Sequence, residues 1–581
     1  MGKVDTNVGE LIGMIARGDL RLPEMQRRYV WPATRVRDLL DSLYRGYPSG
    51  SILIWETEQE APTRNLAVEQ EKTAFMTQKL LLDGQQRLTS LYAVLNGEPV
   101  TVRNRKKPIE ILFNLDHPDG PPVELTEVED DLEFPTLEFG DDDPEEDLEP
   151  EELNIQQRLT RRTFVVSSKQ LLSIPTWVKV SDVFNGTKGD WSILRPLGLK
   201  PDDPLYEKYA QRLQKLRQIK NYPYVMQVLE WNLAYEEVAE IFVRVNSLGV
   251  KLRGSDLALA QVTARWQNSL KMFEEFAEEL EESWFTLDVG LLVRAMVVFA
   301  THQSRFKTVQ NISVTKMKEA WEEAKRGLQF AVNFLRTNAG IEDESLLTSP
   351  FIIIAIAAFG VIRNAELTSQ EEKQLLRWIL TANARGRFSR GSTETILEQD
   401  LNLIFRKDPV ENLFTLMGQQ FGRLHIESQD FVGRGARSPL FSTTYLALKA
   451  RGARDWRSGL GLSLTHQGKI HYIEYHHVFP KSLLVGRYEK AEINEIANIA
   501  FISGKANRKI LNKEPKKYFP EIIARQGEEA LRKHLIPTNP TLWEVERYRD
   551  FLEWRRQQLT EAVNTLLDTP ARLLRAANNP E

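Results

Sequence analysis

Hydrophobic positions in the first hundred residues switch between helical and extended spacing. Apolar residues recur three and four positions apart over residues 8–15, 36–43 and 88–95, and each stretch ends near a glycine, which predicts three helices. Short apolar runs at residues 51–55 and 79–82 predict buried strands. Strands that alternate with helices are typical of an α/β or α+β domain.

An acidic stretch interrupts this pattern before it resumes. Fifteen Asp and Glu residues, with no Lys or Arg, lie between Glu127 and Glu152, and so many uncompensated carboxylates cannot be buried. Three later runs again have strand character: residues 164–166, 177–180 and 225–231. We therefore predict one N-terminal domain, residues 1–255, that carries a solvated acidic insertion at residues 116–155.

The rest of the chain divides by pattern into a helical part and a mixed part. Residues 256–424 show mostly helical spacing, whereas residues 425–581 begin with strand-like runs near 471–478 and 499–502 before helices resume. The longest apolar run, Pro350 to Ile362, has 13 residues, and a helix needs about 20 to span a bilayer. We therefore expect a buried helix there and no membrane partner.

Composition narrows the class of protein. A hydrophobic share of 42% and a charged share of 27% are ordinary for a folded chain. The absence of cysteine excludes disulfides, thiolate zinc sites and a cysteine nucleophile. The opening residues lack the pattern of a signal peptide, so we expect a cytoplasmic protein. Residues 434–517 contain 16 basic and 6 acidic residues, which points to a polyanionic partner for that segment.

The first candidate site is Asp83-Gly84-Gln85-Gln86-Arg87, between a predicted strand and a predicted helix. Backbone N–H groups at such a turn form an anion site, and Arg87 would add a guanidinium fork for a phosphate. Asp83 would repel a bare phosphate but could hold Mg²⁺ or orient a water molecule. The structural alternative is an Asp that caps the helix, followed by polar residues that face solvent.

Two further stretches carry weaker signals. Residues 21–32 combine arginines with Tyr29 and Trp31, which suits phosphate binding and base stacking. The alternative is that both rings fill the core. Residues 241–249 show period-two spacing, which predicts a strand with Arg244 opposite its apolar face and a turn that begins at Asn246.

The strongest candidate is a pair of histidines near the C-terminus. His476 and His477 lie in a predicted strand, so they point to opposite faces unless a kink or bulge brings both imidazoles near one pocket. An imidazole can take a proton from water at neutral pH, and a second imidazole with an Asn carbonyl can hold a divalent cation. Asn498 follows, and we expect Asn507 on the first turn of a helix that faces back to the strand.

Several of these motifs resemble one known family. The Gln26-Arg27-x-Tyr29-x-Trp31 motif, residues 83–87 and residues 242–249 are similar to GmrS-like N-terminal domains, whose fold is like the ParB/sulfiredoxin nucleotide-binding fold. Residues 387–392 and Asp400 look like a helical signature of the same proteins.

The histidine pair resembles a GmrD-type HNH nuclease. The combined resemblance implies a multidomain α+β protein. Its parts would be a ParB/sulfiredoxin-like α/β domain at residues 1–255, a helical domain at 256–424 and a ββα-metal (HNH) nuclease domain at 425–581.

The nuclease resemblance implies a role for each residue of the C-terminal motif. His476 and Asn507 fall at the metal-ligand positions, His477 at the general-base position and Asn498 at a position that braces the backbone. Related nucleases often have Asp or Glu where this chain has His476. The resemblance implies Mg, Mn or Ni as the metal. Having His at this position leaves the preferred metal open, because imidazole suits Ni, Zn or Mn better than Mg.

The N-terminal resemblance implies binding and hydrolysis of a nucleoside triphosphate (GTP, ATP, CTP or UTP), with Asp83 and Arg87 as catalytic residues. The residues assigned to nucleotide binding are Gln26, Arg27, Asp83, Gly84, Gln85, Gln86, Arg87, Arg244 and Asn246. Those assigned to DNA binding are Tyr29, Trp31, Arg508, Lys509 and Lys513.

The implied function is an NTP-dependent and metal-dependent DNA endonuclease or nickase of a modification-sensing, type IV-like anti-phage restriction system, as in SspE-type proteins. Its partner would be double-stranded DNA, with phosphorothioate or modified cytosine as candidate modifications, and a homodimer stays open. The alternatives are an NTP-regulated DNA-binding defence protein with an inactive HNH site and an RNA-directed nuclease. The intact His477 and Asn507 favour the enzyme.

Overall fold

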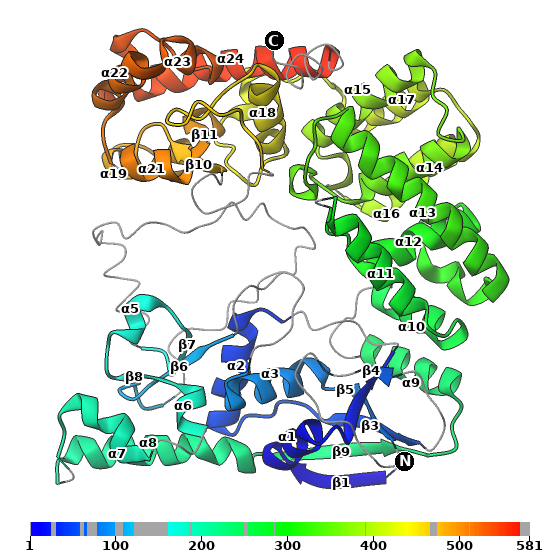
Figure 1. The fold of residues 1–581 in the computed structure, drawn as a ribbon, viewed down its shortest axis with the longest axis vertical. Helices are drawn as coiled ribbons and strands as arrows, with labels where there is room; N and C mark the ends of the chain where they lie inside the picture. The colour runs from blue at the N-terminus through cyan, green and yellow to red at the C-terminus, as the bar shows by residue number, and fades with distance from the viewer. Residues whose placement is uncertain are drawn as a thin grey trace. The chain divides into compact units, whose positions relative to one another are not determined.

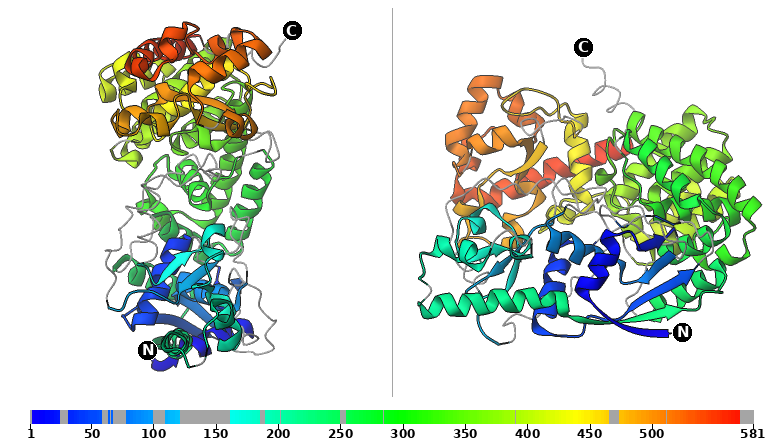
Figure 2. Two further views of the ribbon diagram at one scale, coloured as in Figure 1. Left: turned by 90° about the vertical axis from the view of Figure 1, so that its left-hand side faces the viewer. Right: turned by 60° about the horizontal axis from the view of Figure 1, so that its bottom comes forward.

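The computed structural model describes residues 2–24, 31–57, 63–64, 66, 78–98, 109–120, 161–184, 189–200, 202–248, 254–283, 285–389, 391–464, 473–510 and 512–569. The chain forms two compact units, one made of Met1–Asp130 with Glu145–Leu270 and the other of Asp131–Pro144 with Lys271–Glu581. Figures 1 and 2 show both units as ribbons. The acidic block between Glu127 and Glu152 lies outside the described residues.

The first unit is built on a mixed six-stranded sheet. The strands, in spatial order, are β1 (Gly2–Asn7), β9 (Pro223–Leu229), β3 (Ile52–Thr57), β5 (Gln78–Asp83), β2 (Leu20–Pro23) and β4 (Thr63–Arg64). Strand β9 pairs with both β1 and β3, so the chain beyond the acidic stretch returns to the middle of the same sheet. The strands predicted at residues 51–55, 79–82 and 225–231 are therefore confirmed as β3, β5 and β9.

Helices cover both faces of this sheet. Ile52 and Ile54 share a hydrophobic core with α1 (Val8–Ala16), α2 (Ala33–Arg45) and α3 (Gln85–Asn96). Leu53 and Trp55 point the other way, into a second core with α9 (Tyr235–Leu248) and α10 (Gly254–Arg265). Because β3 is buried on both faces, its sequence is a continuous apolar run instead of an alternation.

Helix α9 replaces the strand and turn predicted at residues 241–249, so that prediction was wrong. Val238, Ala239 and Phe242 are buried in the second core at helical spacing, whereas Val245 is 42% exposed. The period-two pattern predicted a strand because it counted the exposed Val245 together with the partly buried Ile241 and Val243 as one apolar face. Packing of the 238–242 stripe against the sheet determines the structure instead.

A smaller three-stranded sheet, in the order β7 (Phe164–Val166), β6 (Ile111–Asn114) and β8 (Trp177–Lys179), also belongs to the first unit. Short helices and one long helix surround it: α5 (Lys169–Leu172), α6 (Val180–Phe184), α7 (Asp190–Leu194) and α8 (Pro204–Arg217). Arg212 of α8 is buried and donates hydrogen bonds to the Leu115 carbonyl at 2.7 Å and to Asp119 at 2.8 Å.

The second unit begins with a helical array. Its helices are α12 (Val289–Thr301), α13 (Val314–Thr337), α14 (Phe351–Ile362), α15 (Ser369–Arg385), α16 (Thr393–Phe405) and α17 (Val410–Phe421), and α11 (Ser269–Glu281) leads into it. Helix α14 is the long apolar run, and it is buried against α13 and α16, as predicted. Within the described residues, the helices fall short of the length and apolarity needed to cross a membrane.

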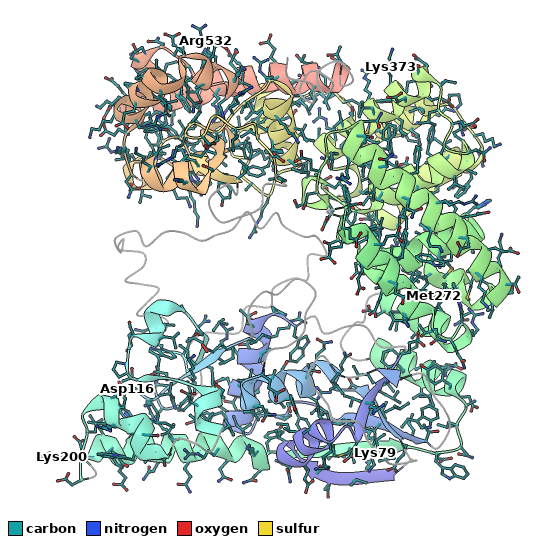
Figure 3. The ribbon with its side chains drawn as sticks, viewed as in Figure 1. Lys79, Asp116, Lys200, Met272, Lys373 and Arg532 are labelled. Atoms are coloured by element: carbon teal, nitrogen blue, oxygen red, sulfur yellow. The ribbon has the colours of Figure 1, made fainter. Side chains whose placement is uncertain are left out.

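The C-terminal part of the second unit holds a two-stranded hairpin among helices. The hairpin pairs β10 (Ile473–His477) with β11 (Ile499–Ser503). The helices are α18 (Pro439–Ala450), α19 (Lys481–Leu484), α20 (Lys490–Ile493), α21 (Gly504–Ile510), α22 (Pro515–Gln526), α23 (Glu529–Lys533) and α24 (Tyr548–Asp568). Figure 3 shows Lys373 on α15 and Arg532 on α23 among the charged side chains of this unit.

Short 3₁₀ helices connect many of these elements. They are η1 (Arg195–Leu197), η2 (Gln218–Asn221), η3 (Phe306–Asn311), η4 (Glu344–Leu346), η5 (Arg387–Ser389), η6 (Ser428–Phe431), η7 (Ile496–Asn498), η8 (Pro540–Trp543) and η9 (Val545–Arg547).

A buried ion pair explains the motif at residues 387–392. Arg387 of η5 donates to both carboxylate oxygens of Asp400 on α16, at 2.8 and 2.6 Å. Its remaining terminal nitrogen donates to Gln420 of α17 at 2.7 Å. Both charged side chains are almost fully buried, 1% and 0% exposed. The pair therefore ties three segments of the helical array together.

Replacing Arg387 by Ala should destabilise the second unit by about 3–5 kcal/mol, because the Asp400 carboxylate stays buried without its partner. The measurement is denaturant-induced unfolding followed by circular dichroism. The control is Arg377→Ala, which removes an ion pair to Asp568 whose side chains are 53% and 59% exposed and should cost less than about 1 kcal/mol. Equal losses in the two variants would contradict this role for the buried pair.

Candidate functional site

The two adjacent histidines lie in a regular part of the hairpin. His476 pairs with Ala500 and His477 with Ile499, and the register does not shift between them. The kink that would have brought both imidazoles into one pocket is therefore not present. His476 is buried, with its ring 6.0 Å from that of Trp456, whereas the partly exposed His477 lies 6.0 Å from Tyr475 on the opposite face.

His476 contacts the helix that follows the hairpin. Asn507 lies on α21 and faces back to β10, as predicted, with its Oδ1 atom 2.8 Å from Nδ1 of His476. An amide oxygen only accepts, so Nδ1 carries the hydrogen and Nε2 keeps its lone pair. That Nε2 atom is buried without a hydrogen-bond partner among the described residues. Burial lowers the pKa of His476 to about 4, so the ring is neutral at pH 7.

His477 is neutral for the same reason. Burial, together with the positive charges of Lys481 and His476, lowers its pKa to about 3, and a hydrogen bond with the Asn494 side chain acts in the opposite direction. Although the residue is partly exposed, its Nε2 atom is buried, and it has no hydrogen-bond partner among the described residues. A neutral imidazole with an unused nitrogen can accept a proton from a water molecule.

Asn498 braces the backbone beyond the histidines. Its Oδ1 accepts a hydrogen bond from the Phe479 N–H at 2.9 Å, and its Nδ2 donates to the carbonyls of Phe479 and Ile493 at 3.1 and 3.0 Å. The Val478 N–H also donates to the Asn498 carbonyl at 2.7 Å. The side chain is fully buried, and it fixes the chain where β10 ends.

Asp455 is a structural residue of this centre that sequence reasoning missed. Its Oδ1 accepts from the Ser503 N–H at 2.7 Å, and its Oδ2 accepts from the N–H and hydroxyl of Ser458. Burial alone would raise the pKa of Asp455, but the hydrogen bonds from Ser458 and Ser503 outweigh it and lower the pKa. The Asp455-Trp456-Arg457-Ser458-Gly459 turn was the available signal, because Asp often accepts from residues two or three positions later.

The residues predicted to bind DNA in the C-terminal part lie on α21 or just after it. Lys509 and Lys513 are exposed, and Lys513 forms an ion pair with Glu521 at 3.5 Å. The side chain of Arg508 is outside the described part of the structure.

The Asp83 turn of the first unit has the predicted strand–turn–helix form. β5 ends at Asp83, Gly84 has φ of +102°, and α3 starts at Gln85 without a side-chain cap. The Gly84 N–H donates to the Asp83 carboxylate at 2.8 Å. A Cβ atom at Gly84 would lie 2.5 Å from Ile52 Cδ1, so both the backbone angle and the space favour glycine.

The guanidinium group of Arg87 is hydrogen-bonded to other groups of the protein. One terminal nitrogen donates to the Ser49 carbonyl, and the other donates to the Ser51 carbonyl at 2.8 Å and to Asp83 at 3.1 Å. Only 13% of its side chain is exposed, against 37% for Asp83. The guanidinium therefore holds the 49–51 loop, in addition to any contact with a phosphate.

The other residues predicted to bind the nucleotide differ in their burial and in their contacts. Gln86 Oε1 accepts from the Trp31 N–H at 3.2 Å. The Trp31 ring packs against the first core, as in the alternative prediction for this ring. Gln85 is buried. Arg244 is exposed on α9 and pairs with Glu240. Gln26, Arg27 and Tyr29 lie outside the described residues, and so does the side chain of Asn246.

The fold nevertheless places two of the sequence motifs on neighbouring elements. Leu80 and Leu82 of β5 share a core with Phe242 of α9. The turn at Asp83 and the helix that carries Arg244 therefore belong to one packed structure.

A resident metal ion has two candidate ligands at the hairpin. Among the described residues there is no cluster of three or more His, Asp or Glu side chains of the kind that holds a metal. The Nδ1 atom of His476 and the Oδ1 atom of Asn507 are 2.8 Å apart. In the present tautomer Nδ1 carries the hydrogen, so it becomes a ligand only when that hydrogen stands on Nε2 instead. Two ligands at roughly 2.1 Å from one ion, about 90° apart, would be separated by about 3 Å, so this donor pair fits an ion completed by water and substrate oxygens.

Comparison with known proteins gives a family match for the first unit and one relative along the chain. Residues 8–263 match the family model described as GmrSD restriction endonuclease, N-terminal domain. That range contains the six-stranded sheet from α1 onward, the Asp83 turn and α9. The chain is also 23% identical to an uncharacterized protein of Methanocaldococcus jannaschii, MJ0686, over 98% of this chain and 97% of the relative. The match therefore relates residues 8–263 to the N-terminal domain of these restriction endonucleases.

Replacing Asn498 by Ala should loosen the hairpin end, because the Phe479 N–H and two carbonyls lose their buried partner, at about 1–3 kcal/mol for each unsatisfied group. Hydrogen exchange of the amide of Phe479 should accelerate, as measured by mass spectrometry on the peptide that contains it. Asn512→Ala, at an exposed position of the same segment, is the control and should exchange like the wild type. Unchanged protection of Phe479 would refute the bracing role.

Proposed function

We propose that the hairpin and α21 form a metal-dependent nuclease centre that hydrolyses DNA phosphodiesters in a restriction system. The observation that carries the proposal is the contact between His476 and Asn507, with neutral His477 on the next position of the strand. The match of residues 8–263 to a restriction endonuclease domain supports DNA as the substrate.

His476 and Asn507 are the residues that would hold the divalent ion. The ion would supply positive charge to the phosphate oxygens as negative charge builds up on them. An imidazole nitrogen beside an amide oxygen suits Mn or Ni better than Mg. Asn498 contributes indirectly, because it fixes the backbone that follows His477.

His477 is the proposed general base. Its neutral ring takes a proton from a water molecule while the water oxygen forms a bond to phosphorus and the phosphorus bond to the leaving oxygen breaks. The leaving oxygen then takes a proton from solvent. A base with a low pKa is weak, but an approaching phosphodiester anion stabilises the protonated ring and therefore raises the pKa of His477.

The Asp83 turn is the proposed nucleoside triphosphate site, which would license cleavage. Support comes from a helix N-terminus without a side-chain cap, a glycine that lets the backbone approach closely, and the partly exposed Asp83. Asp83 would hold a magnesium ion or orient water, and Arg87 would contribute while it holds the 49–51 loop. Sensing of phosphorothioate or modified cytosine belongs to the same proposal.

His477→Ala should lower the rate of plasmid nicking by about 10²- to 10⁴-fold, because the general base is lost. The assay uses supercoiled DNA, modified and unmodified, with Mg, Mn or Ni and each NTP. His302→Asn is the control, since His302 is exposed at the end of α12, outside the hairpin. Wild-type nicking by a folded His477→Ala chain would exclude this centre and leave a DNA-binding protein with an inactive HNH site as the function.

Asp83→Asn should lower NTP hydrolysis by roughly 10²-fold, because the turn loses the charge that positions a metal ion or water. Release of inorganic phosphate from each of the four NTPs is the measurement. Asp202→Asn, an exposed position in the same unit, serves as the control. If hydrolysis is unaffected in the Asp83 variant, the nucleotide site lies elsewhere.

A further inference from the structure

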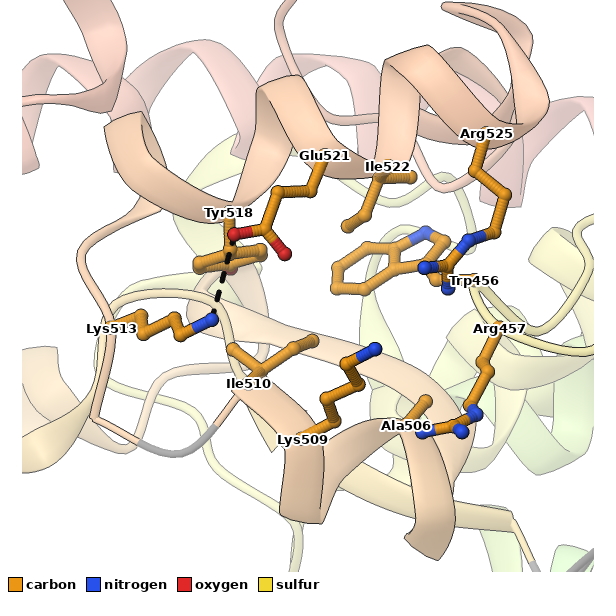
Figure 4. A pocket seen from close by; sticks show the side chains of 10 residues that line it. All are labelled: Trp456, Arg457, Ala506, Lys509, Ile510, Lys513, Tyr518, Glu521, Ile522 and Arg525. Atoms are coloured by element: carbon orange, nitrogen blue, oxygen red, sulfur yellow. Dashed lines mark hydrogen bonds and ion pairs between the residues drawn. The ribbon is translucent and has the colours of Figure 1, made fainter.

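A hollow lies behind the proposed nuclease centre, between α21 and α22. Figure 4 shows it from close by, with Trp456 between Ile522 and Arg525 on one side and Lys509 on the other. It encloses about 410 Å³, including the part open to solvent. Residues from three stretches of the chain line it, so it exists only in the folded protein.

The charged side chains around the hollow are mostly cationic. Arg457, Lys509 and Arg525 line it, and none of them has a carboxylate within ion-pair distance among the residues that the structure describes. Lys513 also lines it and is paired with Glu521 at 3.5 Å. Four positive charges therefore meet one negative charge, which is already neutralised by its neighbour.

Trp456 adds a directed donor to this group. The residue is 2% exposed, and its indole N–H has no hydrogen-bond partner among the described residues. Figure 4 shows the indole nitrogen on the edge of the ring nearest Arg525. The ring is held by its neighbours His534 and Tyr518, with centroids 5.2 and 6.2 Å away. A buried donor left unsatisfied costs free energy that an acceptor in the hollow would recover.

We propose that this hollow binds a phosphate group. Every unsatisfied polar group that faces it is a donor or a cation, which suits a ligand that has only acceptor oxygens and negative charge. A metal cation is disfavoured by the same charges. Arg457 and Arg525 present guanidinium groups, whose geometry matches phosphate oxygens.

The place of the hollow identifies the source of the phosphate. Trp456 lies against His476, and Ala506, which also lines the hollow, precedes Asn507 in α21. A DNA strand cleaved at the hairpin carries further phosphates close by, because each strand has one for about every 3.4 Å of helix axis. We therefore assign the site to a backbone phosphate next to the cleaved one. This assignment rests on the proposed function, whereas phosphate binding itself does not.

The test has two arms, both with the full-length chain in chelator-containing buffer without metal. Isothermal titration with sodium phosphate measures the site alone, and fluorescence anisotropy with a labelled 20-base-pair duplex measures DNA binding. Trp456→Phe keeps the ring and removes the N–H, and Arg525→Gln removes one charge. We expect affinity to fall about tenfold in each variant and in both arms. Arg451→Gln, exposed in the same basic segment but outside the hollow, should bind like the wild type.

Salt dependence separates direct phosphate contact from loosened packing. Arg525→Gln should reduce the slope of log affinity for DNA against log salt by about 0.9, whereas Trp456→Phe should leave the slope unchanged because it removes no charge. Thermal melting of each variant controls for folding.

Each outcome decides a separate point. Weaker binding in both arms supports the backbone phosphate, and weaker binding of inorganic phosphate alone overturns the DNA assignment in favour of a free phosphate. Wild-type affinities in both arms overturn the site. Cleavage plays no part in either arm, so a chain without nuclease activity can still give the expected result, and an active nuclease can fail it.

Discussion

The buried amide of Asn498 is the interaction on which the C-terminal centre depends. A strand that ends inside a protein leaves backbone N–H and C=O groups that need partners. Here one side chain satisfies the N–H and the carbonyl of Phe479, just after the two histidines, and also the carbonyl of Ile493 at the end of α20. Because the end of β10 is fixed in this way, β10 and β11 stay in register and the helix that carries Asn507 can meet His476.

Polar side chains also hold the backbone at the Asp83 turn, where they serve the fold as well as the proposed chemistry. Arg87 holds two carbonyls of the preceding loop, and Gln86 accepts from the backbone of Trp31. Asp83 is the most exposed charge of the motif that the structure describes. Two of the motif's side chains therefore build the turn, and the carboxylate is the group most available to a ligand.

Neighbouring residues of α21 have different roles because they lie on different faces of the helix. Asn507 turns toward the histidine strand, whereas Ala506, Lys509 and Ile510 face the hollow shared with α22. A single short helix thus supplies a ligand for the proposed metal and a wall of the proposed phosphate site. The buried Trp456 ring lies between them and contacts His476, so the two sites share one layer of side chains.

Local spacing was sufficient to predict α1, α2, α3, β3 and β5, because in each case the apolar positions match the period of the element that buries them. It also placed Asn507 opposite the histidine strand. It failed at residues 241–249, since the period-two reading included Val245, which is exposed, and only packing against β5 shows that the buried stripe is helical. The sequence also did not show whether the strand is kinked at His476 and His477. The regular pairing of these residues with Ala500 and Ile499 is seen only in the structure.

The sequence by itself therefore determined which residue types stand at the turn and in the hairpin, because those motifs are continuous in the chain. Only the tertiary structure decided their surroundings. The bracing role of Asp455, the occupied guanidinium of Arg87 and the hollow beside Trp456 all depend on residues tens of positions apart. Such contacts leave no local period in the sequence, since they are created when separate elements pack together.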